Sequence, residues 1–200
     1  EIIEQKLQVL EKWPVNSLIN DFAVDSIGNI WVATDYAGLK KIPVLQRYVE
    51  RVSCIEQMTC LCVSQNATSG NTFYAGVASS YVEHCSSMRQ IKAFKGHTCW
   101  DIQEDERGNI WGASNDGLLC SSDVLAKKAT CYSHADCGFG RCLYFSQRGV
   151  YLGTTCGLFL FDYKLQKLLP VLNQNQQTIS YVYTIRKLGG TVFVTTLGNG

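Results

Sequence analysis

The sequence lacks a long hydrophobic run and has almost no net charge. No stretch of its 200 residues approaches the roughly 18 consecutive apolar residues of a membrane-spanning helix. Its 18 basic and 17 acidic residues leave a formal charge of +1, and the longest basic runs are the doublets Lys40-Lys41 and Lys127-Lys128. Binding nucleic acid by phosphate neutralisation needs a clustered basic face. We therefore expect no nucleic-acid partner, and membrane attachment only through other parts of a full-length protein.

The sequence also lacks the short motifs of common catalytic sites. It contains no G-x-S-x-G elbow, H-E-x-x-H helix, phosphate-binding loop or dinucleotide fingerprint. Its three histidines, His84, His97 and His134, are not accompanied by the paired C-x-x-C or H-x-x-x-H spacing of a zinc site. We expect no metal ion, no other cofactor and no catalytic activity in this segment.

An internal repeat of about 41 residues is the strongest feature that is present. Five segments share a turn glycine, an aromatic residue and, two positions later, a small residue. The aromatic anchors, spaced 43, 37, 40 and 42 residues apart, are Trp31, Tyr74, Trp111, Tyr151 and Phe193. The small residues are Ala33, Gly76, Ala113, Gly153 and Thr195. Short strand-forming runs about every 8 to 12 residues, without a helical period, indicate all-β structure.

Four short strands per repeat are typical of a β-propeller blade. We predict an all-β propeller segment over residues 1–200, with repeats at 18–52, 58–96, 98–134, 141–173 and 180–200. Residues 1–12 are expected to form the outer strand of a preceding blade. The prediction is thus a partial ring of four full blades and parts of a fifth. Such an arc leaves an unpaired strand edge and an exposed blade face, and both favour association.

Two apolar residues three positions apart precede each anchor and mark the first strand of the blade. The pairs are Ile19/Phe22, Cys60/Val63, Cys99/Ile102, Cys142/Phe145 and Val182/Ile185. We expect Cys60, Cys99 and Cys142 to share one repeat position and to pack as small hydrophobic residues. Cys131 and Cys137 are close enough in sequence for a loop disulfide in an oxidising compartment. The outer strands are expected at 46–49, 91–94, 129–132 and 167–171.

Two acidic residues stand before turn glycines, in Asp25-Ser-Ile-Gly28 and Asp105-Glu-Arg-Gly108. A carboxylate at this place accepts hydrogen bonds from the backbone N–H groups of the turn. We interpret Asp25 and Asp105 as structural residues. The alternative is an acid and base pair of a lyase or hydrolase.

Written as D-x-x-G-N-I-W-V-A-T-x-x-x-G-L, the repeat resembles that of the two-component regulator propellers, the extracytoplasmic sensor region of hybrid histidine kinases in Bacteroidetes. Residues 19–42 and 99–122 are good copies and 142–162 is a fair one, while Tyr74 and Val77 depart from the pattern in the second copy. The resemblance implies a periplasmic, non-catalytic segment that senses glycans or their breakdown products. Similar strands occur in lyases of the virginiamycin B type, so a propeller lyase or hydrolase and a protein-interaction scaffold are the alternatives.

Loops of a propeller converge around the axis at one face, and here they carry aromatic, amide and carboxylate groups. Sugar rings bind by stacking on aromatic rings and by hydrogen bonds to their hydroxyl groups. The predicted ligand-binding residues are Asp35, Tyr36, Trp100, Asn115, Asp116, Arg141 and Thr155. The alternative is a set of ordinary polar loop residues, with Trp13 and Trp100 packed between blades. Besides an oligosaccharide, the expected partners are the remaining blades and downstream domains of the same chain, or a second copy of it.

Overall fold

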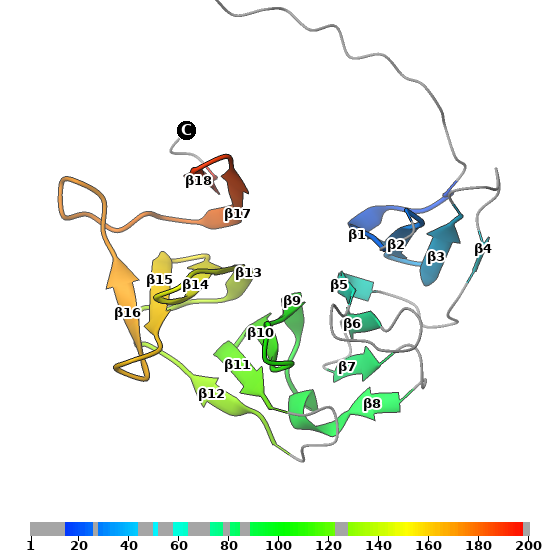
Figure 1. Ribbon diagram of the computed structural model, residues 1–200, viewed down its shortest axis with the longest axis horizontal. Coiled ribbons are helices and arrows are strands. Elements are labelled where there is room, and N and C mark those ends of the chain that lie inside the picture. The colour runs from blue at the N-terminus through cyan, green and yellow to red at the C-terminus, as the bar shows by residue number, and fades with distance from the viewer. Residues whose placement is uncertain are drawn as a thin grey trace, which may run out of the picture.

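The computed structural model describes residues 15–25, 28–43, 50–51, 58–63, 73–77, 81–84, 89–122 and 128–197. Over these residues the strands form four four-stranded antiparallel sheets and one two-stranded sheet, and the only helical segment is a short 3₁₀ turn. Each sheet is a meander of strands adjacent in sequence. Figure 1 shows the sheets arranged in chain order around a common centre, as blades of an open propeller. The predicted fold class is confirmed.

Each blade begins with its innermost strand and continues outward. The first blade contains β1 (Ile19–Val24), β2 (Ile30–Thr34), β3 (Leu39–Ile42) and β4 (Glu50–Arg51). The second contains β5 (Met58–Val63), β6 (Phe73–Val77), β7 (Tyr81–His84) and β8 (Arg89–Ile91), followed by the 3₁₀ helix η1 (Lys92–Phe94). The third contains β9 (Cys99–Glu104), β10 (Ile110–Ser114), β11 (Gly117–Ser121) and β12 (Thr130–Tyr132). The fourth contains β13 (Gly140–Phe145), β14 (Gly149–Thr154), β15 (Leu158–Asp162) and β16 (Lys167–Val171), and the last sheet contains β17 (Val182–Leu188) and β18 (Thr191–Thr196).

The five aromatic anchors occupy one structural position, in the second strand of each sheet. Their partners across the innermost strands are Ala23, Cys62, Gln103, Tyr144 and Arg186. Trp31, Tyr74 and Trp111 are buried, Tyr151 is half-buried, and Phe193 is 52% exposed. The first four pack in clusters that include residues of the next blade, whereas Phe193 belongs to the last described sheet. The anchors are therefore the side chains through which each blade holds the following one.

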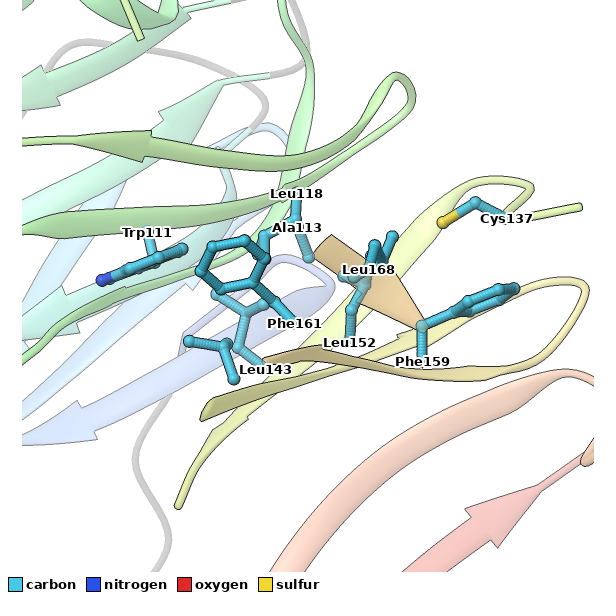
Figure 2. Packing of buried hydrophobic residues seen from close by; sticks show 10 residues of the cluster. Trp111, Ala113, Leu118, Cys137, Leu143, Leu152, Phe159, Phe161 and Leu168 are labelled. Atoms are coloured by element: carbon cyan, nitrogen blue, oxygen red, sulfur yellow. The ribbon is translucent and has the colours of Figure 1, made fainter. Parts of the chain in front are cut away.

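The interface between the third and fourth blades shows this packing most fully. In Figure 2, Trp111 and Ala113 of β10 face Leu143 of β13 and Phe161 of β15. The ring centroids of Trp111 and Phe161 are 5.5 Å apart. The small side chain of Ala113 belongs to the same buried cluster as Leu152, Phe161 and the tryptophan. Burial of each large apolar side chain contributes about 1.5–3 kcal/mol, so this interface is a major part of the core.

The strand pairing corrects the predicted equivalence of three cysteines. Cys60 and Cys142 pair with glycines of their second strands, whereas Cys99 pairs with Ser114. Cys60 and Cys142 therefore stand at the repeat position of Asp101, and Cys99 lies two residues earlier. Every blade has the same β-bulge in its first strand, so the bulge does not cause the discrepancy. The hairpin between the first and second strands differs in length from blade to blade, and this hides the register of the first strand in the sequence. All three cysteines are buried, as expected.

The outer strands agree with prediction in two blades and differ in a third. β12 and β16 lie within the predicted 129–132 and 167–171. In the second blade β8 ends at Ile91, and residues 92–94 form η1 instead of a strand. Burial of Ala93 and Phe94 in the core beside Cys99 explains the difference, because it draws the chain inward. The predicted strand at 46–49, residues 1–12 and Trp13 lie outside the described residues.

The first and last described blades expose apolar side chains on their outward faces. In β1, Phe22 and Val24 are 66% and 56% exposed, although Ile102, the equivalent of Phe22, is fully buried. In the last sheet Leu188 and Phe193 are 75% and 52% exposed. The exposed blade faces expected for an open arc are thus present at both ends of the described ring.

Candidate ligand site at the propeller axis

The innermost strands surround a cavity of about 1800 Å³ at the centre of the ring. All five described sheets contribute to its wall, which mixes charged, amide and aromatic side chains. Representative lining residues are Asp35, Trp100, Asp101, Gln103, Arg141 and Arg186. Ligand pockets are commonly concave spaces of about 300–1,000 Å³, so the axis has room for an extended ligand together with water.

Trp100 and Arg141 point toward this axis because each occupies a β-bulge. In β9 and in β13 the ladder to the second strand shifts by one residue, which leaves Trp100 and Arg141 without a cross-strand partner. A bulge bends the strand and re-aims the extra side chain. Both side chains line the axial cavity. The residues at the same bulge in the other blades are Asn20, Thr59 and Tyr183.

Asp35, Asn115 and Thr155 share a second position, directly after the second strand of their blades. Each donates its backbone N–H to a carbonyl just before the first strand, at N···O distances of 3.0, 3.2 and 2.9 Å. The accepting carbonyls belong to Leu18, Thr98 and Phe139. Five of the seven predicted residues thus belong to two repeat positions at the same end of the blades.

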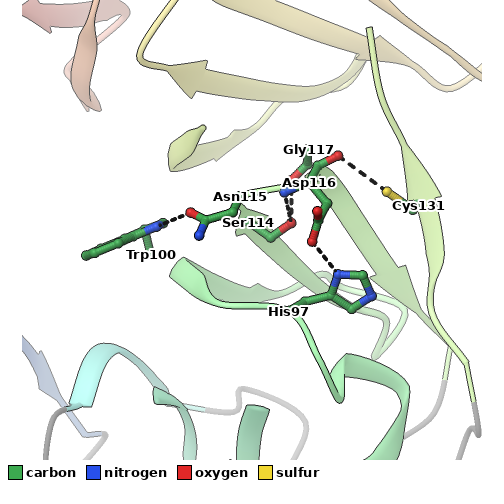
Figure 3. Close-up of polar contacts among 7 residues, drawn as sticks. All are labelled: His97, Trp100, Ser114, Asn115, Asp116, Gly117 and Cys131. Carbon is green, nitrogen blue, oxygen red and sulfur yellow. Dashed lines mark hydrogen bonds and ion pairs between the residues drawn. The ribbon is translucent and has the colours of Figure 1, made fainter. Parts of the chain in front are cut away.

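The structure brings Trp100, Asn115 and Arg141 together. The Trp100 indole Nε1 donates a 2.7 Å hydrogen bond to Asn115 Oδ1 (Figure 3). The Arg141 guanidinium, which comes from the next blade, lies 4.4 Å from the centroid of the Trp100 ring. The Arg141 Nε atom is buried and has no hydrogen-bond acceptor. This cluster is an aromatic platform with a fixed guanidinium on it and the Asn115 amide at its edge.

Asp116 is directed away from this cluster, although it follows Asn115 in sequence. Its Oδ2 lies 2.7 Å from His97 Nδ1. Its backbone N–H donates to Ser114 Oγ, and its carbonyl accepts a hydrogen bond from the Cys131 thiol. In Figure 3 the side chains of Asn115 and Asp116 point to opposite sides, toward Trp100 and His97 respectively. Asp116 does not line the axial cavity.

The remaining predicted residues have different surroundings. Asp35, which is half-buried, lines the axial cavity from the first blade. Tyr36 is 65% exposed and does not line the cavity, and its backbone N–H donates to Ser17 Oγ. Thr155 Oγ1 accepts a 3.0 Å hydrogen bond from Phe139 N and therefore closes the loops of its own blade. Of the seven, the structure places Asp35, Trp100 and Arg141 on the cavity wall, with Asn115 held beside Trp100.

Two axial carboxylates, Asp21 and Asp101, were missed by the sequence analysis. Asp21 Oδ2 accepts a 2.9 Å hydrogen bond from Leu61 N of the next blade, and Asp101 Oδ2 accepts one of 2.7 Å from Leu143 N. Burial, opposed by the hydrogen bond from Leu143 and reinforced by the charge of Asp21, raises the pKa of the Asp101 carboxyl to about 7. Burial also raises the pKa of Asp21. Both residues lie ten positions before a tryptophan anchor, which is the signal that could have identified them.

The turn carboxylates Asp25 and Asp105 have the structural role expected of them. Asp25 Oδ1 accepts a 2.9 Å hydrogen bond from Asn29 N, and Asp105 Oδ1 accepts one of 2.8 Å from Asn109 N. Both carboxylates also accept a hydrogen bond from the side-chain amide of the same asparagine. They hold the hairpin turns of the first and third blades.

The disulfide that the spacing of Cys131 and Cys137 would allow is not formed, because both cysteines are free. Cys137 is buried in the core between the third and fourth blades, while Cys131 is exposed on β12. Among the described residues, no group of three or more His, Cys, Asp or Glu side chains could hold a metal ion. The part of the chain that the structure describes also has no helix that is long and apolar enough to cross a membrane.

Comparisons with solved structures find the same fold in longer proteins. The extracellular domain of the putative hybrid two-component system BT3049 from B. thetaiotaomicron matches 98% of this chain with a TM-score of 0.71 and 18% identity. That of the putative hybrid two-component system BT4673 from the same organism matches 96% with a TM-score of 0.66 and 12% identity. This chain spans only 28% and 33% of those two structures. The computationally designed protein Ika8 matches 92% of this chain and 72% of its own, with a TM-score of 0.53 and 14% identity. No protein-family model and no curated protein significantly matches the sequence.

Proposed function

We propose that this chain is a ligand-binding part of the extracytoplasmic sensor region of a hybrid two-component system, and that it binds an oligosaccharide at the propeller axis. The likeness of nearly the whole chain to extracellular domains of two such systems supports the sensor role. The cluster of Trp100, Asn115 and Arg141 on the wall of the axial cavity is the observation that carries the ligand class. Aromatic faces beside amide and charged hydrogen-bonding groups suit sugar rings and their hydroxyl groups.

The axial position suggests how binding would become a signal. A ligand on the axis contacts several blades at once, so it favours the arrangement of blades that fits it best. A sensor responds when the ligand binds one of two conformations more tightly than the other. The segment is a non-catalytic, periplasmic binding module in this proposal, and the kinase belongs to the full-length protein.

The proposal includes partners for the exposed blade faces. Phe22 and Val24 on one end, with Leu188 and Phe193 on the other, are covered by the remaining blades of the same chain or by a second copy. Light scattering of the isolated chain tests this: reversible association is expected, and a monomer at all concentrations would contradict it.

Ligand binding is tested by thermal denaturation and calorimetry with a panel of oligosaccharides. A ligand at about 100 times its Kd stabilises the folded state by about 2.7 kcal/mol, which gives a measurable rise in Tm. Trp100→Ala is expected to abolish the rise. Phe139→Ala is the matched control, because Phe139 is an exposed aromatic residue that does not line the cavity. Absence of binding by every oligosaccharide would overturn the proposal, and conversion of an oligosaccharide into products would point to a lyase or hydrolase instead.

A further inference from the structure

The Arg141 guanidinium is a charged group of the axial rim with a buried N–H that has no acceptor. The other bulge residues at its level, Asn20, Thr59, Trp100 and Tyr183, carry no charge. Another arginine on the cavity wall, Arg148, has an acid partner, because its Nε lies 3.1 Å from Asp162 Oδ2. Arg141 forms no ion pair among the described residues, and its buried Nε lacks an acceptor.

Arg141 is held by a π system instead of by an acid. The guanidinium lies over the Trp100 ring at 4.4 Å, and the ring is fixed by the 2.7 Å hydrogen bond from its Nε1 to Asn115 Oδ1. Stacking on an aromatic face orients a guanidinium while leaving its N–H groups free to donate in the plane. The same hydrogen bond uses the Asn115 oxygen, so the amide N–H groups of Asn115 are further donors at this rim.

A buried N–H without an acceptor costs free energy, and a bound acceptor removes that cost. A guanidinium matches carboxylate and sulfate oxygens best, because two parallel N–H groups can meet two oxygens of one anion. Two carboxylate groups of the cavity wall already accept hydrogen bonds: Asp101 Oδ2 from Leu143 N and Gln103 Nε2, and Asp21 Oδ2 from Leu61 N. Asp35, the acid of the first blade, lines the same cavity and is available to accept hydrogen bonds from sugar hydroxyl groups.

We infer that the axial site selects an anionic oligosaccharide, whose carboxylate or sulfate group is bound by Arg141 on the Trp100 platform with Asn115 as an additional donor. The inference rests on the proposed function, because it specifies the class of sugar that the axial site takes. It also accounts for a charged residue at a bulge position that is uncharged in the other described blades.

The experiment compares matched probes by isothermal titration calorimetry on the whole chain. One pair is tri-galacturonate and its methyl ester, which lacks the negative charges and carries methyl groups in their place. The other pair is a sulfated chondroitin disaccharide and its desulfated form. The anionic member of one pair is expected to bind about tenfold to a hundredfold more tightly than its neutral counterpart, the range of a charge-assisted hydrogen bond. Preference in the first pair identifies a carboxylate ligand, and preference in the second identifies a sulfate ligand.

Arg141→Gln is expected to remove the preference, while Arg141→Lys retains part of it, because a lysine keeps the charge but not the paired donors. Lys164→Gln, which removes one positive charge away from the cavity, is the matched control and keeps the preference. If the Arg141 variants do not fold, competition by sodium sulfate on the unaltered chain tests whether the site binds an anion. Equal affinity for both members of each pair would overturn the inference and leave the proposed function standing. Absence of binding by all four probes and by neutral oligosaccharides would overturn both.

Discussion

The indole Nε1 of Trp111 donates a 2.9 Å hydrogen bond to Oδ2 of Asp105, six residues earlier. The same bond joins Trp31 and Asp25 in the first blade, also at 2.9 Å. One carboxylate thus holds the turn and satisfies the buried tryptophan, so that the blade interface can include an indole ring without an unpaired N–H. The acid and the tryptophan therefore occur together in the repeat because they are hydrogen-bonded to each other.

Removing the carboxylate should destabilise the third blade. Asp105→Ala leaves the Trp111 N–H and the Asn109 backbone N–H without their acceptor, at a cost of about 1–3 kcal/mol each before any rescue by water. The expected result is a lower urea midpoint and a lower Tm. Glu106→Ala is the matched control, because Glu106 is an exposed acid in the same turn. Equal stability of the two variants would contradict this role of Asp105.

Acidification should weaken the same turn. Partial burial tends to raise the pKa of the Asp105 carboxyl. The hydrogen bonds from Asn109, Trp111 and Arg107 N outweigh it, and together they lower that pKa. A carboxyl group whose folded-state pKa lies below its unfolded value stabilises the fold above the unfolded pKa, and this contribution is lost as the pH falls through the folded one. The acid branch of the stability curve should therefore flatten in Asp105→Ala below about pH 4. An unchanged acid branch would exclude Asp105 as its source.

Asp101 should give the opposite pH dependence. Burial is the main cause that raises the pKa of Asp101 to about 7 in the folded chain, from the usual 3.8 of an aspartate side chain. The folded state then binds more protons than the unfolded state between about pH 4 and pH 7, so stability falls as the pH rises through that window and is constant above it. Asp101→Asn keeps an acceptor for Leu143 N and should remove this slope in urea midpoints measured from pH 4.5 to pH 8. The exposed residue Asp136 supplies the control, Asp136→Asn, which should retain the slope.

The fold could be predicted from the sequence because the aromatic anchors recur once per blade. This spacing can be read from the sequence without knowledge of contacts between distant residues. The bulges could not be predicted, because an extra residue in a ladder has no residue signature of its own. Cys60 and Cys142 were placed with Cys99, although they stand where Asp101 stands, because the hairpin between the first and second strands differs in length between blades. The end of β8 was also predicted wrongly. Phe94 is buried against residues of the next blade, and the hydrophobic pattern of a strand carries no information about such contacts.

The candidate site could be predicted as a set of loops but not as a set of side chains. Asn115 and Asp116 are adjacent polar residues in one turn, and the sequence gives no reason to separate them. The structure does so through their partners, since Trp100 holds Asn115 and His97 holds Asp116. Asp101 was missed because it lies within a strand, where a carboxylate finds its acceptor role only once the next blade is in place.

Thiol labelling should distinguish the free cysteines by their position. Cys131 and Cys156 are exposed, whereas Cys137 is buried and its pKa is raised to about 11, mainly by burial. Because the thiolate is the reactive form, iodoacetamide at pH 8 should label Cys131 and Cys156 within the time in which Cys137 stays unmodified. Peptide mapping by mass spectrometry identifies each site, and unfolding in urea should make all three react alike. A peptide pair joined through Cys131 and Cys137 under non-reducing conditions would contradict the free thiols of the structure.

Gly153 in β14 tests the close approach of the fourth and fifth blades. A Cβ added there would lie 2.5 Å from Cys142 Sγ and 2.6 Å from Val182 Cγ1 of β17, which is closer than atoms can pack. Gly153→Ala should therefore destabilise the chain by about 1–3 kcal/mol, the usual cost of overpacking a core. Gly190→Ala is the control, because no atom lies within 4 Å of the position its Cβ would take. Since Cys142→Ala removes one of the two clashing atoms, the double variant should recover part of the loss in urea denaturation. Additive losses in the two single variants would mean that Cys142 and Gly153 are not in contact, and would contradict the register in which they pair.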